Sequence, residues 1–261
     1  MKRTLIRPDF DSVPEEFHPL LKNAAVYDSS CSREAQVLFI DKDCGYFLKS
    51  APVGSLRNEA ILDEYFHKKG LSSAVLAYRS WERDWLLTER VCGEDCTFAP
   101  YLDDPRRLCD TIATLLRTLH ETETADCPIQ SRMETYLQTA VHNYENGIYD
   151  ASLFPDNWGF ASADEAWRTL ENGKHRFEQN VLLHGDYCLP NILLDNWRFS
   201  GFIDLGNGGV GDRHVDLFWG AWTLNFNLKT DAYRKRFFDA YGRDKIDPDR
   251  LRTVAAAEMF G

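Results

Sequence analysis

The sequence predicts an α+β protein of two lobes, a small antiparallel β-sheet with one helix followed by a larger, mainly helical region. Three observations predict this arrangement. Apolar and polar residues alternate in short runs over residues 24–50 and 74–91, as they do in half-buried strands. Helical spacing replaces the alternation after Cys96, and short strand patterns return at 181–204. We therefore expect a first lobe at 1–92 and a second lobe at 93–261.

The elements of the first lobe follow from the order of its patterns. Strand-like alternation covers residues 35–41 and 45–50, and helical spacing follows over 55–69. A second pair of strand patterns occupies 74–80 and 84–91. The order strand, strand, helix, strand, strand predicts a small antiparallel sheet with one helix.

The second lobe is predicted from helix caps and apolar faces. Asp104 and Pro105 suit the N-cap and the first position of a helix. Residues 130–178 and 216–260 are mostly helical in pattern, and Asp231 is expected to cap a helix within the second of these ranges.

Composition and charge exclude several functional classes. The 261 residues carry a formal net charge of −11, which disfavours nucleic-acid binding through a basic surface. An acidic protein attracts cations, so a cationic small molecule suits it, although solubility alone also explains the charge. The sequence shows neither a signal peptide nor an apolar run long enough for a membrane span. We therefore expect a cytoplasmic protein with reduced cysteines, and the oligomeric state stays open.

The sharpest chemical signal is the segment HGDYCLPN at 184–191, followed by Ile-Asp-Leu-Gly at 203–206. Phosphoryl transfer from ATP needs a carboxylate that orients and deprotonates the attacking hydroxyl, and ligands that hold Mg²⁺ against the phosphates. The spacing matches the kinase catalytic loop H-x-D-x-x-x-x-N and the metal-binding D-x-G. It predicts Asp186 as the base and Asn191 and Asp204 as magnesium ligands. The alternative is an Asp-rich turn that caps strands.

Two residues of the first lobe complete the predicted kinase machinery. Lys49 ends a strand, and Glu59 lies in the helix that follows. A strand lysine that contacts the ATP phosphates and is oriented by a helix glutamate is the kinase pairing, whereas an isolated pair of this kind is usually a solvated surface pair. Phe47, two residues before the lysine, is a candidate to flank adenine, with core packing as the alternative.

The expected phosphate loop does not match the glycine-rich pattern of protein kinases. The corresponding stretch, residues 28–33, contains Ser29, Ser30 and Ser32 instead of glycines. Small hydroxyl residues still allow donors to approach phosphate, and a plain polar hairpin turn is the competing interpretation.

The segment HGDYCLPNILLDNWRFSGFIDLGNGGVGDRHVD at 184–216 resembles the aminoglycoside phosphotransferase family, in particular the 3′-phosphotransferases (kanamycin kinases). The resemblance extends to RDWLLTERVCGEDC at 83–96 and LLRTLH at 115–120. It implies a bilobal protein-kinase-like fold that uses ATP and Mg²⁺, with a nucleotide-binding lobe at 1–92 and a catalytic, substrate-binding lobe at 93–261. It also implies transfer of the γ-phosphate to a hydroxyl, most often the 3′-hydroxyl of a kanamycin- or neomycin-type antibiotic.

The same resemblance implies roles for further residues. Thr88 and Arg90 would offer backbone hydrogen bonds to adenine, and the three serines of 28–33 would cover the phosphates. Asp216 would support the catalytic loop. On the substrate side, Glu258 matches one acidic position of the family. Asp156 and Asn157 resemble another acidic position of the family.

The substrate side also departs from the family. Ala257 stands where an aspartate is usual, Asn207 replaces the arginine that commonly follows D-x-G, and residues 222–227 are apolar and neutral where charged residues are usual. Two alternatives therefore accompany the aminoglycoside kinase. One is a kinase of another hydroxylated metabolite, such as an amino sugar or amino alcohol, and the other is a non-catalytic nucleotide-binding module.

Overall fold

The computed structural model describes residues 3–31, 35–149 and 159–261, and the chain divides into two compact units. The first unit comprises the chain up to Asp95 together with Leu193–Gly206, and the second comprises Cys96–Ile192 and Asn207–Gly261. The hairpin at 193–206 thus groups with the first unit, whereas the sequence-based boundaries placed it in the second lobe. The functional assignment of the two lobes stays a prediction.

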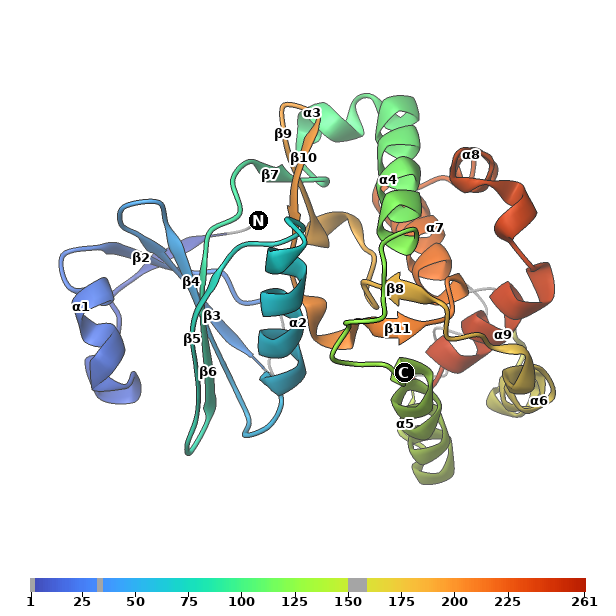
Figure 1. The fold of residues 1–261 in the computed structure, drawn as a ribbon, viewed down its shortest axis with the longest axis horizontal. Helices are drawn as coiled ribbons and strands as arrows, with labels where there is room; N and C mark the ends of the chain where they lie inside the picture. The colour runs from blue at the N-terminus through green and yellow to red at the C-terminus, as the bar shows by residue number, and fades with distance from the viewer. Residues whose placement is uncertain (1–2, 32–34, 150–158) are drawn as a thin grey trace. The chain divides into compact units, whose positions relative to one another are not determined.

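A six-stranded antiparallel sheet dominates the described part of the first unit, with the strand order β1-β2-β3-β4-β6-β5 (Figure 1). The predicted order of two strands, a helix and two strands is confirmed, and two strands that were not predicted separately precede it. The elements are β1 (Thr4–Ile6), α1 (His18–Leu21), β2 (Ala25–Asp28), β3 (Gln36–Asp41), β4 (Tyr46–Ala51), α2 (Arg57–Lys68), β5 (Val75–Ser80) and β6 (Asp84–Glu89).

The two faces of this sheet are covered differently, which fixes the direction of each side chain in β4. On one face, Leu48 is fully buried in a cluster with residues of the N-terminal segment such as Phe17. On the other face, Leu86 of β6 packs with Ala60 of α2. Lys49 is the cross-strand partner of Leu86, so strand alternation directs the lysine to the face that α2 covers.

The hairpin at 193–206 is held to the first unit by its own short sheet. The elements of that sheet are β7 (Glu94–Asp95), β9 (Ile192–Asp195) and β10 (Arg198–Phe202), in the order β10-β9-β7. The ring of Phe202 also meets Phe66 of α2 edge-on, with the ring centroids 6.4 Å apart. The pairing of β7 with β9 could not be predicted from the local sequence pattern, because β7 is only two residues long.

Helices form most of the described part of the second unit, together with a two-stranded ribbon. The elements are α3 (Ala99–Leu102), α4 (Pro105–His120), α5 (Arg132–Asn146), α6 (Ala163–Gly173), β8 (Val181–Leu183), β11 (Gly209–Gly211), α7 (His214–Leu228), α8 (Arg234–Tyr241) and α9 (Pro248–Glu258). The N-cap of α4 is confirmed, because the Asp104 carboxylate accepts a hydrogen bond from the Arg107 N–H (3.2 Å).

The predicted cap at Asp231 is wrong. Helix α8 begins at Arg234, and its N-cap is Tyr233, which makes no capping bond with its side chain. Asp231 instead forms a salt bridge with Arg234 (2.8 Å). The Asp231 carboxylate therefore pairs with a side chain, and the Arg234 N–H donates to the Asp231 backbone carbonyl (3.2 Å).

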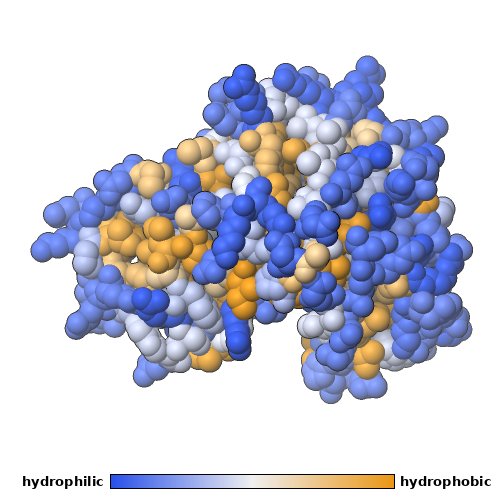
Figure 2. All heavy atoms as spheres, in the orientation of Figure 1, coloured by the Kyte–Doolittle hydropathy of each residue, from blue (hydrophilic) through white to orange (hydrophobic). Residues whose placement is uncertain are grey.

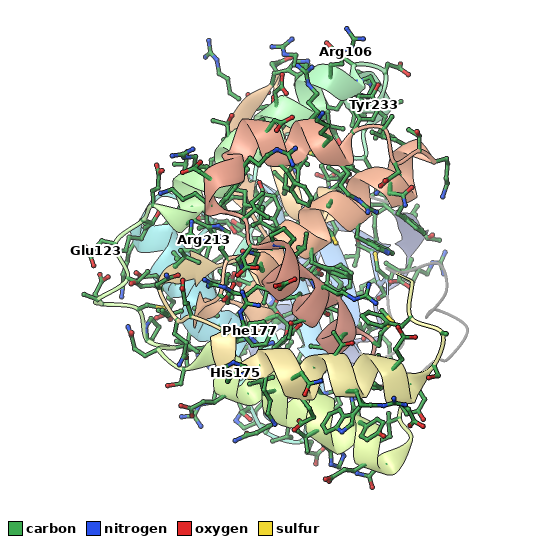
Figure 3. All side chains as sticks on the ribbon, turned by 90° about the vertical axis from the view of Figure 1, so that its right-hand side faces the viewer. Arg106, Glu123, His175, Phe177, Arg213 and Tyr233 are labelled. Carbon is green, nitrogen blue, oxygen red and sulfur yellow. The ribbon has the colours of Figure 1, made fainter. Side chains whose placement is uncertain are left out.

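Packing among these helices defines the core of the second unit. Helix α4 packs on α8, and α6 packs on α9. The Cys109 thiol of α4 donates to the backbone carbonyl of Tyr233, which is labelled in Figure 3 at the start of α8 (3.6 Å). Phe177, also labelled there, meets Tyr136 of α5 edge-on with the ring centroids 6.5 Å apart.

Hydrophilic side chains cover most of the face shown in Figure 2, and hydrophobic patches lie between them. Across residues 3–31, 35–149 and 159–261, no helix has both the length and the apolar character that a membrane span requires. All seven cysteines lie in the described residues, and none of them forms a disulfide.

Candidate active site

The loop that carries the predicted base is anchored by a buried carboxylate on α7. Asp216 has no exposed surface, and its two oxygens accept hydrogen bonds from the backbone N–H groups of His184 and Gly185 (2.8 Å each). His120 of α4 also contacts this carboxylate (3.1 Å). The predicted role of Asp216 as a support of the catalytic loop is confirmed.

Gly185 allows the loop to pass close to another backbone segment. Its φ is +87°, and a β-carbon built there would stand 1.9 Å from the carbonyl oxygen of Asn207. No L-residue with a side chain fits at this position. His184 closes the turn, since its Nδ1 accepts from the Asp186 N–H (3.3 Å), as expected of a structural histidine.

Asp186 and Asn191 lie together on this loop. The Asn191 Nδ2 donates to the backbone carbonyl (3.0 Å) and to Oδ2 (2.9 Å) of Asp186. The Asn191 residue is 6% exposed, whereas the Asp186 side chain is partly open to solvent. The asparagine therefore fixes the orientation of the aspartate, and its own Oδ1 is the atom that suits a metal.

The first unit brings together the other three predicted groups. The Lys49 Nζ lies 2.9 and 2.8 Å from the two carboxylate oxygens of Glu59 and 2.9 Å from Oδ1 of Asp204. Burial alone would lower the pKa of Lys49, but the charges of Asp204 and Glu59 outweigh burial and raise it. The lysine is therefore a permanent cation, held by the helix and facing the aspartate.

The turn that holds Asp204 has a special backbone. Asp204 adopts a left-handed conformation with φ +59°, which is uncommon for a residue with a side chain. Its side chain is 50% exposed, so the carboxylate is accessible. Gly206 packs beside Glu59, where an added β-carbon would lie 3.5 Å from the glutamate Cβ. The D-x-G turn thus rests on the same helix that orients Lys49.

Asp63 is a buried acid of this cluster that the sequence analysis missed. It lies one turn after Glu59 on α2 and is 6% exposed. Burial raises the pKa of Asp63 well above its usual range, and the neighbouring charges of Glu59 and Asp204 raise it further. The i, i+4 spacing from Glu59 was the available signal.

The residues predicted to contact adenine lie on β4, on β6 and directly after β6. Phe47 lies on the same face of β4 as Lys49 and packs on Phe39 with the ring centroids 5.1 Å apart. Thr88 is the cross-strand partner of Phe47. The Arg90 N–H donates to the Gly45 carbonyl (2.9 Å), so one backbone group predicted to meet adenine already has a partner.

The serines of the predicted phosphate loop help to form the turn between β2 and β3. The Ser29 N–H donates to the Val37 carbonyl (2.8 Å), and the Val37 N–H donates to the Ser30 Oγ (2.9 Å). The Ser30 hydroxyl also hydrogen-bonds to the Asp28 carboxylate and lowers the pKa of that group, so the side chain is already part of the turn. Ser32, the third predicted serine, lies outside the described residues.

Glu258, the predicted substrate residue, lies at the end of α9 beside groups of the same unit. Its Oε1 accepts from the Tyr136 hydroxyl (2.8 Å), and the Trp219 side chain also hydrogen-bonds to it. Burial raises the pKa of Glu258 to about 7, and the charge of Asp186 contributes to the increase, against the Tyr136 bond and the Arg132 charge. The other predicted substrate residues, Asp156 and Asn157, lie outside the described residues.

Arg132 of α5 is a further residue that the sequence analysis missed. Its Nε donates to the Asn207 carbonyl (2.6 Å) and its Nη2 to the Asn207 Oδ1 (3.1 Å). The guanidinium therefore meets the residue that replaces the family's arginine. Because the partners are 75 positions apart in the chain, local sequence patterns gave no signal for this contact.

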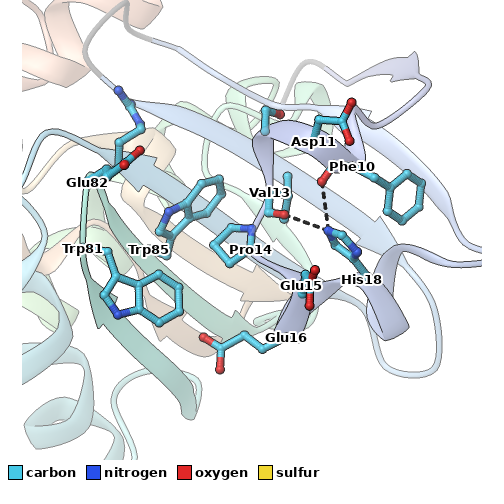
Figure 4. A pocket seen from close by; sticks show the side chains of 12 residues that line it. Phe10, Asp11, Val13, Pro14, Glu15, Glu16, His18, Trp81, Glu82 and Trp85 are labelled. Carbon is cyan, nitrogen blue, oxygen red and sulfur yellow. Dashed lines mark hydrogen bonds between the residues drawn. The ribbon is translucent and has the colours of Figure 1, made fainter.

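A cavity of about 720 Å³ in the first unit contains none of the predicted site residues. It lies between the N-terminal segment and the turn that joins β5 to β6, where Pro14, Trp81 and Trp85 face one another (Figure 4). His18 closes one side by bonding to the carbonyls of Phe10 and Val13. The chemistry-bearing groups described above are elsewhere in the chain.

The predicted metal ligands offer the oxygen atoms that a hard cation such as Mg²⁺ prefers. In the described ranges, no group of three or more His, Cys, Asp or Glu side chains is arranged to hold a metal. Mg²⁺ is usually held by one or two carboxylates together with phosphate oxygens and water. The exposed Asp204 carboxylate and the Asn191 amide oxygen are donors of that kind.

Comparison with known proteins identifies the family. A model described as the phosphotransferase enzyme family matches residues 30–254. The chain belongs to this family. A probable aminoglycoside 3′-phosphotransferase of Lactococcus lactis is 51% identical over 258 residues, which cover 98% of each chain. An aminoglycoside 3′-phosphotransferase of Niallia circulans is 30% identical over 177 residues, covering 68% of this chain and 67% of the relative.

Solved structures of phosphotransferases share the fold. An aminoglycoside 3′-phosphotransferase of type VIII matches with a TM-score of 0.76 at 22% identity, covering 95% of this chain and 100% of the other. An aminoglycoside phosphotransferase of Streptomyces rimosus, in complex with ADP and streptomycin, matches with a TM-score of 0.74 at 23% identity, covering 94% and 98%. The predicted family, bilobal protein-kinase-like fold and kinase-type enzyme class are confirmed.

Proposed function

We propose that this phosphotransferase transfers the γ-phosphate of ATP to a hydroxyl of an aminoglycoside, with the 3′-hydroxyl of a kanamycin- or neomycin-type compound as the first candidate. The observation that carries the proposal is the pair of clusters built by the motif residues. Lys49, Glu59 and Asp204 meet in the first unit, and Asp186 and Asn191 meet in the second. The 51% identity with the Lactococcus relative supports the choice of acceptor.

Asp186 acts as the base in this proposal. Its carboxylate is partly open to solvent and is oriented by the Asn191 amide (2.9 Å). A carboxylate held in this way aligns an acceptor hydroxyl and takes its proton as the oxygen attacks the γ-phosphorus. ADP then leaves, and the phosphorylated acceptor is the second product.

Lys49 neutralises phosphate charge and remains protonated while it does so, because the carboxylates around it raise its pKa. Asp204 and Asn191 are the residues that would hold Mg²⁺, and the ion would supply positive charge to the phosphates. The Lys49 ammonium and the exposed Asp204 carboxylate are the groups that would meet the phosphates and the ion when ATP binds. Glu59 keeps the lysine oriented throughout.

Glu258 provides a carboxylate for an ammonium group of the acceptor, and the charge of −11 attracts such cations. We also propose the cytoplasm as the location, since ATP is available there. A kinase of another amino sugar or amino alcohol is the second candidate. The neutral, apolar segment 222–227 favours it.

The test is an ADP-release assay with purified protein, Mg²⁺ and ATP over a panel that includes kanamycin, neomycin, free amino sugars and amino alcohols. We expect acceptor-dependent ADP release with kanamycin- or neomycin-type compounds, and a mass increase of one phosphoryl group in the product. Turnover of amino sugars or amino alcohols alone would select the second candidate. Nucleotide binding without transfer to any acceptor would indicate the non-catalytic module.

A further inference from the structure

Helix α7 carries three aromatic side chains on one face, and we call Trp219, Trp222 and Phe226 the aromatic wall. Their spacing of three and four residues places them along the same side of the helix. The two indoles meet edge-on with the ring centroids 5.4 Å apart, and Trp222 stacks on Phe226 at 4.9 Å with an interplanar angle of 12°. The three rings therefore form one continuous aromatic surface.

This surface is not sealed in the core of its unit. Phe226 is 55% exposed, and both indoles are partly exposed. The Lys229 ammonium lies 4.2 Å from the centroid of the Phe226 ring. A contiguous aromatic surface left open to solvent marks a binding site more often than a lone exposed ring does. The lysine contact also shows that the outer ring accepts a cation.

The aromatic wall is continuous with the acceptor side of the catalytic loop. Trp219 hydrogen-bonds to Glu258, and the charge of Asp186 acts on the same carboxylate. Thr223, adjacent to Trp222 in the chain, accepts a hydrogen bond from the Leu189 N–H of the catalytic loop (3.0 Å). All of these residues belong to the second unit, so the relation does not depend on the first.

Negative charge is scarce on this part of α7. No Asp or Glu occurs between Asp216 and Asp231. The Asn227 amide turns back to its own helix, donating to the carbonyl (2.8 Å) and the Oγ1 (3.1 Å) of Thr223. Arg132 adds a positive charge that acts on Glu258. The aromatic wall and its neighbours therefore offer a polycation aromatic carbon, a guanidinium and only one carboxylate, which is half-buried.

We propose that the aromatic wall packs against a ring face of the acceptor and that the enzyme favours acceptors with few ammonium groups. This inference rests on the proposed function and specifies its substrate class. Sugar and cyclitol rings present C–H groups on one face, which pack on aromatic rings, while their hydroxyls remain free for Asp186. A single ammonium on such a ring pairs with Glu258.

The first test compares neomycin with paromomycin, which differ only in that one amine of neomycin is a hydroxyl in paromomycin. For the wild-type enzyme we expect kcat/KM with paromomycin to equal or exceed that with neomycin, because ring contacts dominate and an additional ammonium group adds nothing. A kcat/KM with paromomycin clearly below that with neomycin would show that charge recognition dominates and would overturn the inference.

The second test removes the wall. For Trp222→Leu we expect the acceptor KM to rise by about tenfold with an unchanged KM for ATP, the size of effect given by one lost aromatic contact. Trp81→Leu removes an indole of the first unit that is 55% exposed and serves as the matched control. An unchanged acceptor KM in Trp222→Leu would contradict the proposal.

A binding measurement separates failure of the wall from failure of the proposed function. Paromomycin is titrated into nucleotide-free protein while tryptophan fluorescence is recorded, with Trp222→Phe as the variant that keeps a ring. We expect a saturable change that weakens in Trp222→Phe, even if no acceptor is phosphorylated. Absence of any change up to millimolar acceptor, or an identical change in the variant, would overturn the assignment. If the acceptor is phosphorylated and no substitution in the aromatic wall changes the acceptor kinetics, the proposed function holds and the role of the wall is rejected.

Discussion

The chemistry proposed for single residues depends on what each side chain touches. Asp186 is oriented by Asn191, Lys49 is held between two carboxylates, and Glu258 is bonded by Tyr136. Each contact sets a charge state or a direction before any ligand arrives. Such preorganisation is the main contribution a protein makes to phosphoryl transfer.

Replacing Asp186 tests the proposed base. We expect Asp186→Ala to lower kcat by at least about a hundredfold, the scale of losing a general base, with little change in the KM for ATP. The fold should persist because the Asn191 amide still bonds to the backbone carbonyl of residue 186. Steady-state kinetics and circular dichroism measure both quantities. Near-normal turnover would remove Asp186 from this role.

Glu258 should impart a pH dependence on acceptor binding. Its pKa is raised to about 7 by burial, so the carboxylate that attracts an ammonium forms as pH rises through that value. We expect the acceptor KM to fall between about pH 6 and 8 for a cationic acceptor. In Glu258→Gln this portion of the profile should be flat. The same acceptor in both proteins cancels the titration of its own amines.

The raised pKa of Glu258 affects folding stability in the opposite direction, because stability falls as pH rises. A carboxyl with a raised pKa in the folded state binds its proton more tightly than in the unfolded chain. Its contribution to stability is therefore fully present below the unfolded pKa and is lost as pH rises through about 7. As pH rises towards about 7, acceptor binding by Glu258 therefore improves, while the contribution of the same group to folding stability is lost.

At the scale of elements, turns and caps position the residues discussed above. The catalytic loop combines a left-handed Gly185, a buried Asp216 on α7 and a close approach to Asn207. The D-x-G turn combines a left-handed Asp204 with a glycine that packs on α2. Both turns place function on backbone conformations that few residues adopt.

Gly185→Ala tests the close approach in the catalytic loop. Its β-carbon would stand 1.9 Å from the Asn207 carbonyl oxygen, so the loop must shift. We expect kcat to fall by more than about tenfold, together with a clear loss of thermal stability, because geometry in a catalytic loop tolerates small shifts poorly.

Gly54→Ala is the matched control, since Gly54 has the same φ of +87° and nothing within 4 Å of an added β-carbon. It should cost about 1–2 kcal/mol of stability from backbone strain alone and leave kcat intact. Equal activity losses in the two variants would show that strain, and not the contact with Asn207, limits the loop.

At the scale of the whole molecule, the two compact units divide the proposed chemistry. Lys49, Glu59 and Asp204 belong to the first unit, and Asp186, Asn191 and Glu258 belong to the second. Nucleotide recognition and acceptor chemistry are therefore expected to respond to different substitutions.

Thermal unfolding with nucleotide tests this division. At a concentration of Mg²⁺–ATP one hundred times its Kd, binding should stabilise the folded protein by about 2.7 kcal/mol. We expect this shift in the wild type and in Asp186→Ala, and its loss in Lys49→Met. Differential scanning calorimetry with and without nucleotide measures it. A full shift in Lys49→Met would show that the lysine does not contact the nucleotide.

The sequence by itself determined the elements and residues whose meaning is local. Asp186 and Asn191 are five residues apart on one loop, so their spacing alone indicated their joint role. The helix cap at Asp104 was predictable for the same reason, because the capped N–H lies three residues away. The strand and helix order of the first unit followed from periodicity.

Only the tertiary structure decided the contacts between distant segments. It grouped the hairpin at 193–206 with the first unit, and it brought Arg132 to Asn207. It also joined Tyr136 to Glu258 and placed Trp219 beside the same carboxylate. The physical reason is that periodicity and turn chemistry report which face of an element is buried. Which distant face covers it is set by packing of the whole chain.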